Sequence, residues 1–181
     1  MPEARKAATR KAATKKAPAK KAPAKRASSN KPSKLFTIGY ELAKPDAVIA
    51  ELKRAKVKLL IDTRAVAASR KPGFSKRQLA ATLDENGIAY LHLQKLGTPD
   101  DGRQAARAGK LEALWKIYAR HLTRPDAIEA MDELITIVKS GQTVCLLCFE
   151  RDQACCHRSR IAEIVNERTG AEVVNLVPAL I

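Results

Sequence analysis

The chain has 181 residues, enough for one ordinary domain and an appendage, and a formal net charge of +15 at pH 7. It contains no run of about 18 apolar residues, which excludes a predicted transmembrane helix. Its basic N-terminus also lacks the apolar centre of a secretory signal. We therefore expect a protein without a membrane partner.

The positive charge is concentrated at the N-terminus. Residues 1–34 contain twelve of the 34 basic residues and one of the 19 acidic residues, so this tail carries +11 and residues 35–181 carry only +4. From residue 4 onward the tail repeats Lys, Ala and Pro without any aromatic or large aliphatic residue, so it cannot bury enough surface to offset the entropy of ordering. We predict a disordered basic tail at 1–34 and one folded domain at 35–181.

The tail has two interpretations, an inert solubilising extension or a nucleic-acid-binding arm. Its composition resembles that of the C-terminal arms of linker-histone-like proteins. A polycation neutralises phosphates and releases counterions, which favours sequence-independent binding to DNA or RNA. The tail offers no aromatic residue on which bases could stack, so we expect no base specificity.

Five predicted strands alternate with helices beyond the tail. The strands cover residues 35–38, 57–61, 88–93, 143–149 and 172–177. Helices are expected from Pro45, after the N-cap residue Ser75, around residues 111–118, from Pro125 and over 156–168, with a polar loop from Gln94 to about Arg103. This order predicts a single α/β domain with a mostly parallel, roughly five-stranded sheet and helices on both faces.

The candidate site residues follow from that sheet. Ligands of open parallel sheets bind beyond the carboxyl ends of the strands. The polar residues that follow predicted strands there are Tyr40, Asp62, Arg64 and the segment from Cys148 to Arg158. The spacing of Asp62 and Arg64 places both on one side of an extended chain, either as ligand-binding groups or as an internal ion pair.

Several motifs of the domain are shared with a known family. They are Thr37-Ile-Gly-Tyr40, Leu60-Ile-Asp-Thr-Arg64, Ser69-Arg-Lys-Pro-Gly-Phe-Ser75, Gly87-Ile-Ala-Tyr-Leu-His92, Leu96-Gly97, Leu146-Leu-Cys-Phe-Glu150 and Cys156-His-Arg158. With them, nearly all of residues 35–181 resembles the domain-of-unknown-function family 488 (DUF488). The resemblance implies a fold and a site more than an activity, although some members resemble proteins described as DNA-repair factors.

The cysteines carry the most specific chemistry. All four (Cys145, Cys148, Cys155 and Cys156) lie within twelve residues, which favours reduced thiols in the cytoplasm, where the tail would promote association with the nucleoid. Cys156 and His157 stand at a predicted helix start, where a thiol can have a lowered pKa and act as a nucleophile with the histidine as its base. The alternative for Cys145 and Cys148 is that of small buried hydrophobic residues.

Two other arrangements of the cysteines are less favoured. Cys148, His157 and either Cys155 or Cys156 could bind zinc, but Cys145 and Cys148 point to opposite faces of a strand and cannot chelate one ion together. A phosphatase-type Cys-x5-Arg loop would need glycines that the segment lacks. We therefore predict no metal and no cofactor.

These observations lead to two hypotheses of function. In the first, Cys148, Cys156, His157 and Asp62 form a catalytic group, while Arg64, Arg70, Arg158 and Tyr40 bind a phosphate-bearing ligand, a nucleotide or a nucleic acid. In the second, the protein is a non-enzymatic, nucleoid-associated binding module, and the same polar residues are structural. The sequence favours the first hypothesis and leaves both the reaction and the oligomeric state open.

Overall fold

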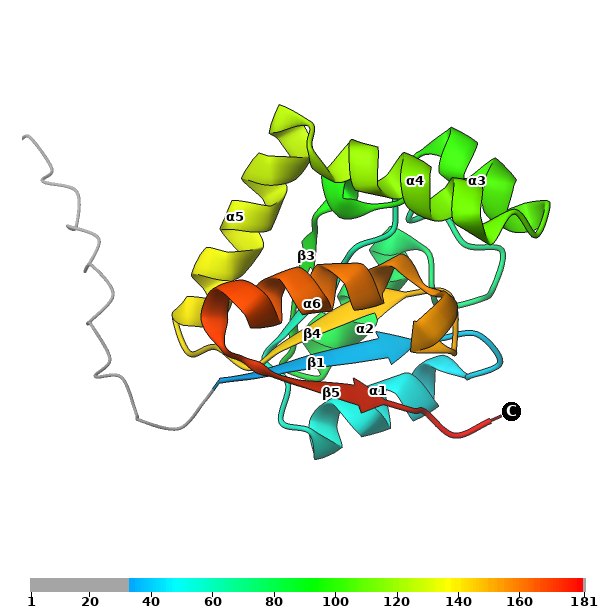
Figure 1. The fold of residues 1–181 in the computed structure, drawn as a ribbon. Helices are drawn as coiled ribbons and strands as arrows, with labels where there is room; N and C mark the ends of the chain where they lie inside the picture. Colours follow the sequence, from blue (N-terminus) through cyan, green and yellow to red (C-terminus); the bar gives the residue numbers. More distant parts are fainter. Residues whose placement is uncertain (1–32, 181) are drawn as a thin grey trace, which may run out of the picture.

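The computed structural model describes residues 33–180 (Figure 1). Five strands form one sheet, and each pairs in parallel with its neighbours in the order β3-β2-β4-β1-β5. The strands are β1 (Lys34–Gly39), β2 (Leu59–Asp62), β3 (Ala89–His92), β4 (Val144–Cys148) and β5 (Glu172–Leu176). The predicted five-stranded α/β architecture is confirmed. The tail prediction, residues 1–34, lies almost entirely outside the described residues.

Within the described part of the chain, six α-helices connect or flank the strands (Figure 1). They are α1 (Pro45–Arg54), α2 (Lys76–Glu85), α3 (Asp100–Arg107), α4 (Leu111–Leu122), α5 (Pro125–Lys139) and α6 (His157–Thr169). Proline occupies the first turn of both α1 and α5, where the missing N–H group costs no hydrogen bond. Across residues 33–180, no helix combines the length and the apolar character needed to span a membrane.

The strand residues alternate between two hydrophobic cores. In β4, Val144 and Leu146 pack with α5 and α6, whereas Cys145 and Leu147 pack with α1 and α2. Successive side chains of a strand point to opposite faces, and here both faces are covered, so β4 is buried along its whole length. The expected placement of Cys145 and Cys148 on opposite faces follows from the same alternation.

The prediction of a polar loop from Gln94 to about Arg103 is wrong. A short 3-10 turn occupies Gln94–Leu96, and α3 begins at Asp100. The Asp100 carboxylate accepts hydrogen bonds from the side chains of Arg103 and Gln104 and so stabilises the first turn of α3. Because only Gly102 of α3 is buried, this helix has no apolar stripe that a periodicity argument could detect.

Candidate functional site

Two polar networks meet at the carboxyl edge of the sheet. β2 ends at Asp62 and β4 ends at Cys148, and these strands are direct neighbours, with Asp62 paired to Leu147 in register. Parallel pairing therefore brings the residues that follow both strands to the same edge, as the sequence predicted.

The first network is a buried ion pair between Asp62 and Arg64. The Asp62 side chain is fully buried, and 6 % of the Arg64 side chain is exposed. Arg64 donates Nε–H to Asp62 Oδ1 at 2.8 Å and Nη2–H to Oδ2 at 2.6 Å, a bidentate contact. Its Nη1 donates to the Tyr40 hydroxyl at 2.7 Å and to the Phe74 carbonyl at 3.0 Å. The guanidinium is therefore committed to protein acceptors.

Aromatic residues complete this network. Tyr40 stacks on Phe74 with ring centroids 4.2 Å apart, and the Tyr90 hydroxyl donates to Asp62 Oδ2 at 2.7 Å. Burial alone would raise the pKa of Asp62, but the hydrogen bonds and charge of Arg64 and the Tyr90 hydroxyl lower it on balance. Burial and the neighbouring carboxylate raise the pKa of Tyr90, which keeps its proton available for that hydrogen bond.

The second network is the cysteine–histidine cluster, which consists of Cys148, Glu150, Cys156 and His157. One donor atom from each residue lies within 4.8 Å of the others. The Cys148 thiol donates to Glu150 Oε2 at 2.8 Å, and the Cys156 thiol donates to the same oxygen at 3.1 Å. Cys148, Cys156 and His157 are buried, while Glu150 is half-buried.

The orientation of His157 is set by Thr63, the residue that follows β2. Its Nε2 lies 3.0 Å from the backbone carbonyl of Thr63, which can only accept, so Nε2 carries the proton and donates. In the neutral ring, Nδ1 is then the atom with the free lone pair, and it lies 3.5 Å from Cys148 Sγ. The Thr63 hydroxyl donates to the Leu147 carbonyl at 2.9 Å and fixes the segment that holds the histidine.

The lowered pKa expected for Cys156 is wrong. Burial, together with the neighbouring Cys148, raises the pKa of the Cys156 thiol well above its ordinary value. Burial also raises the pKa of Cys148. The helix start is in the predicted place, because α6 begins at His157 and Cys156 precedes it, but desolvation of the thiol is the largest cause of its pKa shift.

Arg158 supports the loop between β4 and α6 through hydrogen bonds to the loop backbone. It is 1 % exposed, and its guanidinium donates to the backbone carbonyls of Glu150 and Arg151 and to the Thr37 hydroxyl. This residue thus provides hydrogen-bond donors for two backbone carbonyls of the loop.

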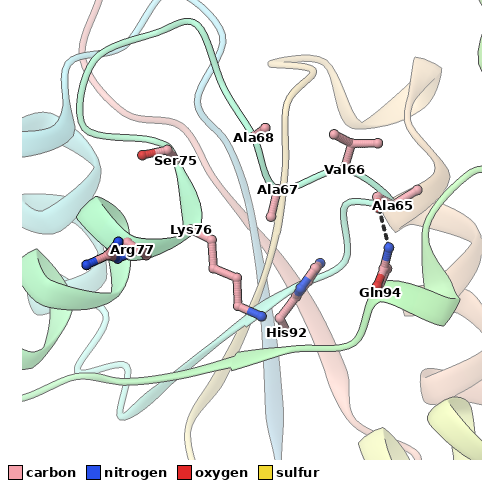
Figure 2. Close-up of a pocket in the computed structure, with 9 residues that line it drawn as sticks. All are labelled: Ala65, Val66, Ala67, Ala68, Ser75, Lys76, Arg77, His92 and Gln94. Atoms are coloured by element: carbon pink, nitrogen blue, oxygen red, sulfur yellow. Dashed lines mark hydrogen bonds between the residues drawn. The ribbon is translucent and has the colours of Figure 1, made fainter.

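An open hollow lies beside these networks, beyond the ends of β2 and β3 (Figure 2). It has a volume of about 490 Å³ and is lined by Ala65, Val66, Ala67, Ala68, Ser75, Lys76, Arg77, His92 and Gln94. Figure 2 shows the Lys76 side chain reaching toward His92, while the Arg77 side chain points away. His92 Nε2 lies 2.8 Å from the Arg64 carbonyl, and Gln94 donates to the Ala65 carbonyl, so both side chains brace the wall.

The structure separates the predicted site residues into three places. Asp62, Arg64 and Tyr40 share the first network, whereas Cys148, Cys156 and His157 share the second. Arg158 lies under the loop, and Arg70 is exposed on the loop before α2 without an ion pair among residues 33–180. None of these side chains lines the hollow beside them, so the predicted site residues do not share one crevice.

Other residues of the two networks were given no role in the site predicted from the sequence. Glu150 accepts from the two thiols, and Glu41 accepts the Arg151 backbone N–H. Tyr90 and Thr63 also belong to the networks, through the Asp62 carboxylate and the His157 ring. Strand alternation was the available signal for Thr63, because a residue between Asp62 and Arg64 must point the other way.

The fold and its strand-end networks define a parallel α/β domain with a polar carboxyl edge. The chain belongs to the family described as domain of unknown function DUF488, whose model matches residues 44–165, more than half of the chain. The family resemblance seen in the sequence is thereby confirmed. Comparisons with curated proteins and with solved structures gave no significant match.

Proposed function

We propose that the protein binds a phosphate-bearing ligand, a nucleotide or a nucleic acid, in the hollow beyond β2 and β3. The observation that carries this function is that Lys76 reaches into the hollow while none of the lining residues is acidic. The hollow lies beyond strand carboxyl ends, where open parallel sheets bind ligands, and its volume lies within the range of small-molecule pockets.

The first turn of α2 strengthens the preference for an anion. Ser75 precedes this helix, but its hydroxyl donates to Gln78 Oε1 at 2.8 Å and does not cap the helix. Within residues 33–180, the backbone N–H groups of Arg77 and Gln78 have no acceptor. Free N–H groups at a helix N-terminus attract phosphates and carboxylates.

The predicted ligand-binding arginines have different places in this proposal. The donors of Arg64 and Arg158 already bind protein acceptors. In this proposal, these two arginines therefore hold the loops of the edge in place and do not bind the ligand. Arg70 is exposed on the loop that leads to α2 and stays a predicted contact for the ligand. The buried arginines also favour the second candidate, a non-enzymatic binding module in which the polar networks are structural.

The basic tail would add affinity for nucleic acid without adding specificity. Its twelve cations stand against one acidic residue, so it can neutralise several phosphates of a DNA or RNA backbone. In this proposal the tail concentrates the protein on nucleic acid, and the hollow contacts one phosphate group. Catalysis, a role in DNA repair and location at the nucleoid stay predictions.

Replacement of Lys76 by alanine tests the hollow. A charge-assisted contact to phosphate contributes about 1.5–3 kcal/mol, so Lys76→Ala in the full chain should weaken binding of adenosine monophosphate about tenfold or more. Calorimetric titration at fixed salt measures the effect. Lys58→Ala is the matched control, because Lys58 is exposed before β2, at the opposite end of that strand. Equal affinities for both variants would contradict the proposed site.

The salt dependence of DNA binding separates the tail from the hollow. For a short DNA duplex, Lys76→Ala should reduce the slope of log affinity against log salt by about one, and neutral replacement of the tail lysines should reduce it several-fold more. If neutral replacement of the tail lysines abolishes the salt dependence and Lys76→Ala does not change it, the hollow does not bind DNA. The second candidate function, a non-enzymatic binding module, would then be the one supported.

A further inference from the structure

We infer that the cysteine–histidine cluster is a binding site for a divalent metal ion of the zinc class. Two sulfur ligands, one imidazole nitrogen and one carboxylate oxygen are the donor types that zinc takes in proteins. Cys148, Glu150, Cys156 and His157 supply this set with all donor atoms within 4.8 Å of one another. The inference does not rest on the proposed binding of phosphate.

The separations agree with four ligands around one ion. Zinc–sulfur bonds of about 2.3 Å and zinc–nitrogen bonds of about 2.0–2.1 Å place sulfur and nitrogen about 3.6 Å apart in a tetrahedron. Cys148 Sγ and His157 Nδ1 are 3.5 Å apart. Glu150 Oε2 lies nearer, 2.8 Å and 3.1 Å from the two sulfurs, so its carboxylate would move slightly outward when an ion enters.

The surroundings of His157 match those of a metal ligand. Metal-binding histidines donate their second ring N–H to a carbonyl or carboxylate, which fixes the ring and directs the other nitrogen to the ion. Here Nε2 donates to the Thr63 carbonyl at 3.0 Å and Nδ1 faces the thiols. This orientation comes from Thr63, the residue that follows β2, so it is built into the fold and does not depend on the cysteines.

The backbone also holds the ligands in place. Cys148 ends β4, Cys156 directly precedes α6 and His157 begins it, so the ligands come from both sides of one loop. Arg158 donates to the carbonyls of Glu150 and Arg151 within that loop. The prediction of no metal was based on Cys145 and Cys148, whereas the structure pairs Cys148 with Cys156 and leaves Cys145 in the core.

Cobalt substitution tests this site in the full chain. Reduced, metal-stripped protein should bind one Co²⁺ per chain and develop thiolate-to-cobalt charge-transfer absorption with tetrahedral d–d bands, and Zn²⁺ should displace the cobalt. Cys148 and Cys156 would bind as thiolates and release their protons to solvent. Absence of these bands, with four free thiols counted after unfolding, would overturn the inference.

Neighbouring cysteines provide a matched control. Cys155 is exposed and precedes Cys156 directly, yet it lies outside the cluster. Cys155→Ser should bind cobalt like the wild type. Cys156→Ser and Glu150→Gln should lose the tetrahedral spectrum or bind cobalt more than about 100-fold more weakly, a larger loss than removal of a group that only supports a ligand would cause. Equal binding by all three variants would overturn the site, even if cobalt binds elsewhere.

Lys76→Ala and Glu150→Gln distinguish this inference from the proposed function and from a folding defect. Lys76→Ala should keep the cobalt spectrum, because Lys76 lines the hollow and lies outside the cluster. If Cys156→Ser fails to fold, Glu150→Gln still tests the ligand set, since glutamine keeps the size of the half-buried side chain. An unchanged cobalt affinity in folded Glu150→Gln would remove Glu150 from the site and contradict the four-ligand set.

Discussion

At the scale of single residues, the Asp62–Arg64 pair connects several segments at this edge of the sheet. Two residues of one strand end satisfy each other, and Arg64 also reaches the Tyr40 hydroxyl and the Phe74 carbonyl. Removal of either charge leaves the other buried without its counter-charge. The energetic penalty for such an orphaned charge is larger than the net contribution of the intact pair.

Replacement of Arg64 by methionine should therefore destabilise the protein strongly. We expect the free energy of unfolding to fall by about 3–5 kcal/mol, because the Asp62 carboxylate stays buried without its cation. The double variant Asp62→Asn/Arg64→Met should lose less than the sum of the two single variants. Urea denaturation measures all three.

An exposed pair serves as the control for that replacement. Arg160 and Glu163 form an ion pair on the surface of α6, with side chains 49 % and 58 % exposed. Arg160→Met should change the free energy of unfolding by less than about 1 kcal/mol. A similar loss for Arg64→Met and Arg160→Met would mean that the buried pair has no special role in stability.

At the scale of elements, β1 approaches the loop after β4 so closely that only glycine fits. A Cβ atom added to Gly39 would lie 1.8 Å from the Glu150 carbonyl oxygen and 2.6 Å from the carbonyl carbon. That carbonyl accepts a hydrogen bond from Arg158. The end of β1 thus determines where the backbone of Glu150 lies.

Gly39→Ala should be costly for this steric reason. Overpacking of a filled site costs about 1–3 kcal/mol, and here the obstacle is backbone that cannot rotate away. Gly141→Ala is the control, because it has open space but a φ of 80°, so it measures the conformational cost alone, about 1–2 kcal/mol. Thermal and urea unfolding should rank Gly39→Ala below Gly141→Ala; the reverse order would contradict the close contact.

The elements also show what the sequence can predict. Strands rich in large aliphatic residues, such as Val144–Cys148, and helices that start with proline were found near their observed bounds. The helix Asp100–Arg107 was missed because its stability comes from side-chain pairs on its own surface. Hydrophobic periodicity is informative only where a helix buries a stripe.

At the scale of the whole molecule, strand order decides which site residues meet. The sequence predicted that Asp62 and Cys148 follow strands, but it did not give the order β3-β2-β4-β1-β5 that makes their strands neighbours. It also could not show that Arg64, just after β2, and Arg158, in the first turn of α6, are turned inward, because side-chain direction there depends on the loops that cover these positions. Fold and edge were therefore predictable, and the division into two networks was not.

The stability of the whole molecule should depend on pH through Asp62. Its pKa in the folded protein is below the ordinary value of 3.8, so its contribution is fully present above about pH 4 and is lost as the pH falls through the folded pKa. The difference in free energy of unfolding between wild type and Asp62→Asn should therefore shrink below pH 4.

Urea midpoints measured across the acidic range check this dependence. Glu163→Gln is the matched control, because it removes one carboxylate from an exposed pair. Its difference from the wild type should stay small throughout. A constant difference between wild type and Asp62→Asn would contradict the lowered pKa of Asp62.

The three residues from Asp62 to Arg64 have a consequence for how this edge opens. Asp62 and Arg64 face one network, and the Thr63 carbonyl between them orients His157 in the other. A rotation of the backbone at Thr63 would break both sets of contacts at once. The loop after β2 and the start of α6 should therefore open and close together. Their backbone amide hydrogens should exchange with solvent as one cooperative unit.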